Sequence, residues 1–104
     1  MAFANRYTNL RFIDKAKLVS VKNNQENFLT VVYLFDSVDI NSFLIANRKN
    51  NIDCKLVRLT KSLFDKKYAN QLEKCNVCFV GINKSWWGKL DINTRYFYLE
   101  IWYE

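Results

Sequence analysis

Apolar and aromatic residues alternate near the end of the chain, and this pattern predicts a terminal strand at about residues 95–103. One face of that strand is an ordinary core face, formed by Phe97, Leu99, Ile101 and Tyr103. The other face is also mostly aromatic, with Tyr96, Tyr98, Glu100 and Trp102. A sheet covered on both sides would explain such a strand, and so would a surface that stacks aromatic rings on a flat ligand.

The same kind of pattern predicts the earlier strands. The clearest is residues 28–35, because a nearly continuous apolar run is typical of a strand that is covered on both faces. A long first strand is expected at residues 10–21, and a polar turn at residues 22–27 would join the two as a hairpin. Two short runs rich in apolar residues flank a basic turn at residues 47–51. These runs, at residues 42–46 and 52–59, predict either a second hairpin or one long bulged strand.

One helical stripe follows at residues 61–74. Phe64, Tyr68 and Leu72 recur at four-residue spacing, and Leu63 widens the stripe. Ser62 is a good N-cap for this helix. We therefore expect one helix whose apolar stripe packs on the sheet, followed by a buried strand at residues 77–82 and a long loop at residues 83–94.

This order of elements, three strands, a helix and two more strands, resembles the OB-fold, a small Greek-key barrel with one helix between its third and fourth strands. The resemblance covers nearly the whole chain and is carried by the order of elements alone. It implies a mainly β fold, either a small OB-like barrel or a strongly curled antiparallel sheet capped by the helix. At 104 residues the chain is expected to form a single domain, residues 1–104.

Composition narrows the class of protein. Half of the residues are hydrophobic, which predicts a folded chain. The net charge is +6, from 16 Lys and Arg against 10 Asp and Glu, and it favours an anionic partner, nucleic acid first and an acidic protein patch second. A basic surface that only aids solubility is the alternative. No signal peptide or membrane span is visible, so we expect a cytoplasmic protein without a membrane partner.

Candidate catalytic residues are few. The chain has no histidine, the commonest general base, and its two glycines are too far apart to form a phosphate-binding loop. Asp36 and Asp39 flank a break between predicted strands and are interpreted as turn residues. We expect no enzyme activity and no cofactor.

The three cysteines are the next candidates for chemistry. Cys75 and Cys78 have the spacing of a metal-binding pair, with Cys54 as a third thiol. A structural zinc site needs four ligands, and the chain offers three and no histidine. Cys78 also lies inside an apolar run, where a free cysteine behaves as a small hydrophobe. We expect neither a bound metal nor a disulfide.

Basic and aromatic residues together predict a binding site. Proteins that bind single strands combine a positive groove with rings on which bases stack. In OB-folds the ligand lies between the loop that joins strands 1 and 2 and the loop that joins strands 4 and 5. The resemblance therefore implies a nucleic-acid site formed by Lys84, Trp86, Trp87 and Lys89 in the last loop, with Arg48, Lys49, Lys55 and Arg58 on or beside the third strand. Because adjacent residues of extended backbone point in opposite directions, one tryptophan of the pair should be buried and the other exposed.

The leading functional hypothesis is a small protein that binds single-stranded DNA or RNA with little sequence preference, as an accessory factor in DNA replication or recombination. The abundance of Asn and Lys resembles proteins of AT-rich genomes, including phages and mobile elements. The alternative is a protein that docks on a nucleic-acid enzyme, such as a polymerase, a primase or a host-defence nuclease, as a subunit or inhibitor. Its docking surface would be the aromatic face formed by Tyr96, Tyr98 and Trp102.

Overall fold

The computed structural model describes residues 8–25, 28–57, 59, 64–81 and 84–102. The strands in these ranges are β1 (Lys17–Gln25), β2 (Phe28–Leu34), β3 (Asn51–Ile52), β4 (Val77–Val80), β5 (Trp86–Leu90) and β6 (Tyr96–Trp102). They are accompanied by two short α-helices, α1 (Ile40–Ala46) and α2 (Ala69–Glu73). Short 3-10 turns complete the described chain, namely η2 (Ile13–Lys15), η3 (Arg48–Asn50), η4 (Cys54–Leu56) and η6 (Lys66–Tyr68).

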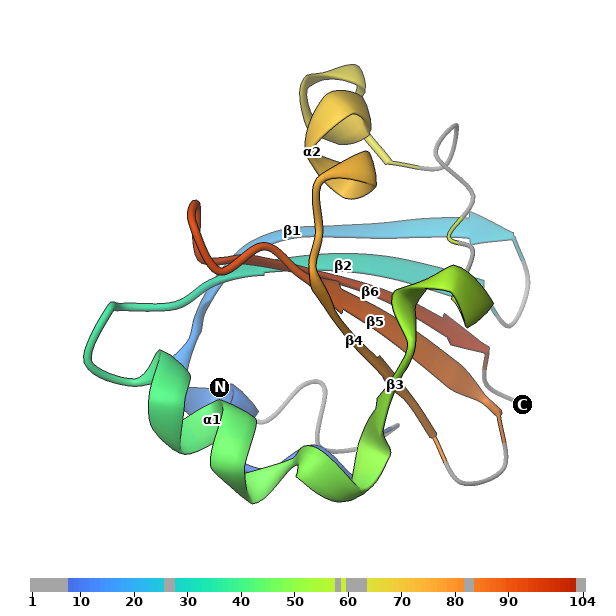
Figure 1. Ribbon diagram of the computed structural model, residues 1–104. Coiled ribbons are helices and arrows are strands. Elements are labelled where there is room, and N and C mark those ends of the chain that lie inside the picture. Colours follow the sequence, from blue (N-terminus) through green and yellow to red (C-terminus); the bar gives the residue numbers. More distant parts are fainter. Residues whose placement is uncertain (1–7, 26–27, 58, 60–63, 82–83, 103–104) are drawn as a thin grey trace.

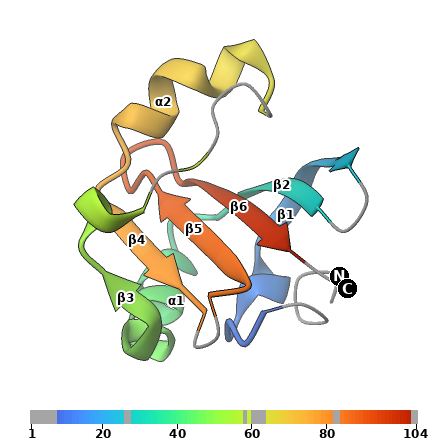
Figure 2. The same cartoon turned by 90° about the vertical axis from the view of Figure 1, so that its right-hand side faces the viewer.

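All six strands form one antiparallel sheet in the order β1-β2-β6-β5-β4-β3. Strands β2 and β6 pair along their whole length, from Phe28 opposite Trp102 to Leu34 opposite Tyr96, and so join the N-terminal hairpin to the C-terminal strands. Figure 2 shows the strands side by side across the sheet. The sheet has two free edges, at β1 and β3, so the mainly β, antiparallel prediction is confirmed and the barrel is wrong.

Both faces of the sheet are covered (Figure 1). One face of the sheet, called the α1 face, is covered by α1 and the segment before β1. Its core includes Leu10, Ile13, Phe43, Phe79, Trp86, Phe97 and Leu99. The α2 face packs against α2 and the chain that leads into it, with Val32, Val57, Leu59, Phe64, Tyr68, Leu72 and Tyr98. Cover on both faces explains why β2 and β6 are apolar on both sides.

Residues 42–46, which we expected to form a strand, lie in helix α1. Ile40 and Phe43 are buried and Leu44 is half-buried, which is helical spacing, while Ile45 is 66% exposed. A short apolar run does not by itself distinguish a strand from a buried helix, and here packing of Phe43 against Phe35, Phe79 and Phe97 selects the helix. The expectation of a single helix is therefore also wrong.

The first hairpin is displaced along the sequence. The predicted strand at residues 10–21 begins only at Lys17, because Phe12 has a left-handed backbone, with φ of 64°, and η2 follows it. At the other end β1 continues to Gln25 through the predicted turn, and residues 26–27 lie outside the described ranges. The polar residues of this turn can pair with β2 because β1 is an edge strand.

Two further predictions are corrected at the other edge of the sheet. Of the predicted strand at residues 52–59, Ile52 ends β3, residues 54–56 form η4, and Val57 is extended, while residue 58 lies outside the described ranges. The predicted loop at residues 83–94 contains strand β5, in which Trp86, Gly88 and Leu90 face one side. Gly88 is required there, because a Cβ atom would lie 2.7 Å from the ring of Phe97.

The predicted helix is shorter than expected. Residues 61–63, which include the expected cap, lie outside the described ranges, and the helical chain consists of η6 followed by α2. The apolar stripe is nevertheless confirmed as core. Phe64, Tyr68 and Leu72 are buried on the α2 face, where the rings of Phe64 and Tyr68 both meet the ring of Tyr98 edge-on.

Candidate nucleic-acid interface

The two central tryptophans of the predicted site lie on opposite faces of the sheet. Trp86 is buried in the α1-face core, where its indole packs directly on Gly81. Trp87 points to the α2 face and is half-buried against the cluster that contains Tyr98. They differ in burial, as the alternation of an extended backbone requires, but neither presents a freely exposed ring.

The predicted cations are also divided. Lys84 is exposed in the connection between β4 and β5, and its N–H donates to the carbonyl oxygen of Gly81 at 2.9 Å. Lys89 is half-buried on the α2 face, across from Tyr98. Arg48 and Lys49 are exposed on η3, and Lys55 is exposed on η4 beyond β3. Arg58 lies outside the described residues.

The predicted docking surface is largely internal. Tyr98 is fully buried, and its hydroxyl donates a hydrogen bond to Gln71 Oε1 at 2.6 Å. Tyr96 is half-buried against Tyr68. Trp102 is 49% exposed and stacks on Phe28 with ring centroids 4.2 Å apart. The three rings therefore do not form one exposed patch, and the docking hypothesis keeps Trp102 as its exposed ring.

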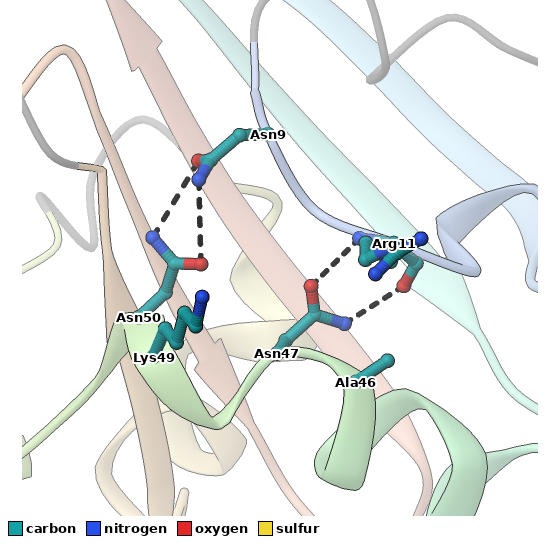
Figure 3. Close-up of a pocket in the computed structure, with 6 residues that line it drawn as sticks. All are labelled: Asn9, Arg11, Ala46, Asn47, Lys49 and Asn50. Carbon is teal, nitrogen blue, oxygen red and sulfur yellow. Dashed lines mark hydrogen bonds between the residues drawn. The ribbon is translucent and has the colours of Figure 1, made fainter.

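A polar pocket lies instead where η3 meets the segment before β1 (Figure 3). It encloses about 250 Å³ and is lined by Asn9, Arg11, Ala46, Asn47, Lys49 and Asn50. Among the described residues, the lining contains two cationic side chains, three carboxamides and no carboxylate. Arg48 is the neighbour of Lys49 on η3, and both are exposed. The pocket thus offers hydrogen-bond donors and positive charge together.

Asn47 holds the two walls of the pocket together. Its Oδ1 accepts a hydrogen bond from the Arg11 N–H at 2.6 Å, and its Nδ2 donates to the Arg11 carbonyl oxygen at 2.7 Å. The same Nδ2 donates to the Phe43 carbonyl oxygen at 2.8 Å. With only 1% of Asn47 exposed, these bonds fix the backbone of Arg11 against the end of α1.

Asn50 attaches the pocket to the sheet. Its Nδ2 donates to the carbonyl oxygen of Val80 at 3.1 Å, at the end of β4. Lys84 follows within a short turn, since its N–H bonds to Gly81, so its backbone lies at the same end of β4. The structure therefore brings the backbones of the predicted Arg48, Lys49 and Lys84 to one end of β4. Trp87 and Lys89 face the α2 side, and Lys55 lies beyond β3.

Phe12 is an exposed aromatic residue next to this pocket in the sequence. It follows Arg11 directly and is 45% exposed. Its φ of 64° lies in the left-handed region, which a bulky residue rarely adopts and which costs about 1–3 kcal/mol. An exposed ring held in a strained conformation next to an arginine is a feature typical of binding sites.

Sequence reasoning missed Asn9, Arg11, Phe12, Asn47 and Asn50. The signal available was the Asn- and basic-rich turn at residues 47–51, which drew attention to Arg48 and Lys49. Nothing in the sequence links that turn to Asn9, which is 41 residues from its partner Asn50.

The cysteines differ from the prediction. Cys54 and Cys78 form a disulfide, with Cα atoms 5.1 Å apart, that ties η4 to β4, so the expectation of no disulfide is wrong. Cys75 is free, and burial together with the nearby Asp91 raises the pKa of its thiol to about 12. A thiol that stays protonated is a poor nucleophile and a poor metal ligand. Within the described ranges no group of three or more His, Cys, Asp or Glu side chains could hold a metal ion.

Comparisons with known proteins give no assignment: no protein-family model matches the chain, and neither the curated proteins nor the solved structures contain a match. Nothing in them supports the OB-fold resemblance. Among the described residues, no helix has the length and apolar character needed to cross a membrane. Function must therefore be argued from the pocket itself.

Proposed function

We propose that this protein binds single-stranded nucleic acid, with no catalytic activity of its own, as a small accessory factor in DNA replication or recombination. The observation that supports the proposal is the pocket between the segment before β1 and η3, whose described lining combines Arg11, Lys49 and carboxamide donors without a carboxylate. The net charge of +6 favours the same class of partner.

In this proposal the cations contact phosphate groups. Arg11 donates from a planar guanidinium, and the clamp from Asn47 holds the Arg11 backbone at the pocket. Lys49 supplies a point charge in the same lining. Arg48 and Lys84, at the same end of the sheet, extend the path of the strand. Phe12 provides the stacking surface that the sequence analysis assigned to a tryptophan, and paired bases in a duplex cannot reach it in the same way.

The test is fluorescence anisotropy of labelled DNA and RNA oligonucleotides of about 12 nucleotides, measured at about 50 and 200 mM salt. Each phosphate contact contributes about 0.7 to the slope of log K against log salt for a single strand. Arg11→Ala and Lys49→Ala should each weaken binding to every sequence and reduce that slope by somewhat less than one unit. Phe12→Ala should weaken binding by about 1–3 kcal/mol with the slope unchanged.

Lys66→Ala is the matched control, because Lys66 is an exposed lysine of η6 on the α2 face. It changes the net charge by the same amount as Lys49→Ala and should have a smaller effect on affinity. Equal losses for the two lysine variants would mean that only overall charge attracts the strand. Unchanged anisotropy of every oligonucleotide at low salt and tens of micromolar protein would refute the proposal, and a protein partner would become the leading alternative.

A further inference from the structure

Two carboxamides in the pocket are not explained by phosphate binding. The side chains of Asn9 and Asn50 point toward each other (Figure 3), and each Nδ2 donates to the other's Oδ1 at 3.5 Å. This distance is at the outer limit for a hydrogen bond, so the pair is weak. By contrast, the clamp from Asn47 to Arg11 has distances of 2.6 and 2.7 Å. Of the hydrogen bonds described between these lining residues, the long pair is therefore the easiest for a ligand to replace.

The hydrogen-bonding capacity of this pair is defined by its surroundings. Asn50 is 7% exposed, and its Nδ2 donates a hydrogen bond to the Val80 carbonyl oxygen, which fixes the orientation of its amide. Asn9 is exposed, so a ligand can reach its amide directly. A carboxamide offers two N–H donors beside an acceptor oxygen, which matches a planar group with an acceptor and a donor side by side.

A nucleobase has such an edge, and the other lining groups favour a purine. Carboxamides pair with N6 and N7 of adenine, whereas arginine and lysine pair with O6 and N7 of guanine, and this pocket contains both kinds of side chain. The acceptor common to the two purines is N7, which pyrimidines lack. The pocket volume of about 250 Å³ is below that of sites for drug-sized ligands and suits a single base.

We propose that the pocket reads one purine of a bound single strand. N7 of the purine accepts a hydrogen bond from Nδ2 of Asn9, and the exocyclic group at position 6 of the purine contacts Asn50. Arg11 and Lys49 bind the adjoining phosphates. The inference rests on the proposed function. It adds a preference for purines, whereas the sequence predicted binding with little sequence preference.

The experiment uses unmodified protein and three single-stranded DNAs of about 12 nucleotides. One alternates C with A, one alternates C with T, and one alternates C with 7-deazaadenine, in which a C–H group replaces N7. Loss of one hydrogen bond of about 0.5–1.5 kcal/mol corresponds to a roughly two- to thirteenfold change in affinity. The strand with A should therefore bind tighter than the strand with T by at least this factor, and the 7-deaza strand should lose most of that advantage.

Asn9→Ala should abolish the preference for A, so that the variant binds the strand with A and the strand with T equally tightly. Asn70→Ala, an exposed asparagine on α2, is the matched control and should keep the preference. Equal binding of all three strands would overturn the base reading and leave the proposed function intact. A preference that survives 7-deaza substitution would show that N7 does not carry it, and one that survives Asn9→Ala would show that Asn9 does not. Either result would overturn the base reading. Absence of binding to every strand would overturn both proposals.

Discussion

Replacing Asn47 with Ala should destabilise the protein and weaken its binding to nucleic acid together. The substitution removes three side-chain hydrogen bonds, two to the backbone of Arg11 and one to the carbonyl oxygen of Phe43. A typical intramolecular hydrogen bond contributes about 0.5–1.5 kcal/mol net. The Phe43 carbonyl oxygen keeps its hydrogen bond from the backbone N–H of residue 47, whereas the N–H and carbonyl oxygen of Arg11 both lose their partner. We therefore expect a loss of roughly 2–4 kcal/mol in the free energy of unfolding.

Urea denaturation followed by circular dichroism measures this loss as a lower midpoint with an unchanged slope. Asn41→Ala, at an exposed position of the same helix, is the control and should change the free energy of unfolding by less than about 0.5 kcal/mol. Binding should be measured where Asn47→Ala is still folded, and there the freed Arg11 segment should reduce affinity for a single strand. If Asn47→Ala were as stable as Asn41→Ala, the clamp would not form and the pocket as described would not exist.

Three further predictions concern the α2 face and the cysteines. Leu72→Ala should lower the free energy of unfolding by about 2–5 kcal/mol in the same urea assay, since Leu72 is 2% exposed; a loss below about 1 kcal/mol would contradict its place in the core. Thiol titration of the unreduced, denatured protein should find one free thiol, and reduction should raise this to three, because Cys54 and Cys78 are paired. Burial raises the pKa of the Cys75 thiol from 9.0 to about 12, and burial also raises the pKa of Tyr98. The folded state therefore binds these protons more tightly than the unfolded state, so the free energy of unfolding should fall as the pH rises above about 9. In Cys75→Ala this fall should be less steep.

Hydrophobic periodicity was reliable where a segment was long and its pattern unambiguous. The run at residues 28–35 became β2, the alternation at residues 95–103 became β6, and the four-residue spacing of Phe64, Tyr68 and Leu72 became the stripe that covers the α2 face. These segments bury most of their side chains, so their sequence records their environment directly.

Short segments were decided by packing. The apolar run at residues 42–46 satisfies either a strand or a helix, and it becomes α1 because Phe43 then fills the space between three other phenylalanine rings. Residues 86–90 read as loop because a glycine and a lysine interrupt the apolar pattern, yet Gly88 is the residue that lets β5 approach Phe97. Local propensity cannot register a constraint that comes from a neighbouring strand.

The candidate site shows the same division. The sequence alone determined a basic, aromatic-rich, mainly β chain, and it singled out Arg48 and Lys49 through their polar turn. Only the tertiary structure placed Asn9 and Arg11 against that turn. It also paired Cys54 with Cys78 and buried Trp86 in the core. The physical reason is that a pocket is formed by side chains distant in sequence, and their meeting depends on how the two halves of the sheet join at β2 and β6, which no local pattern records.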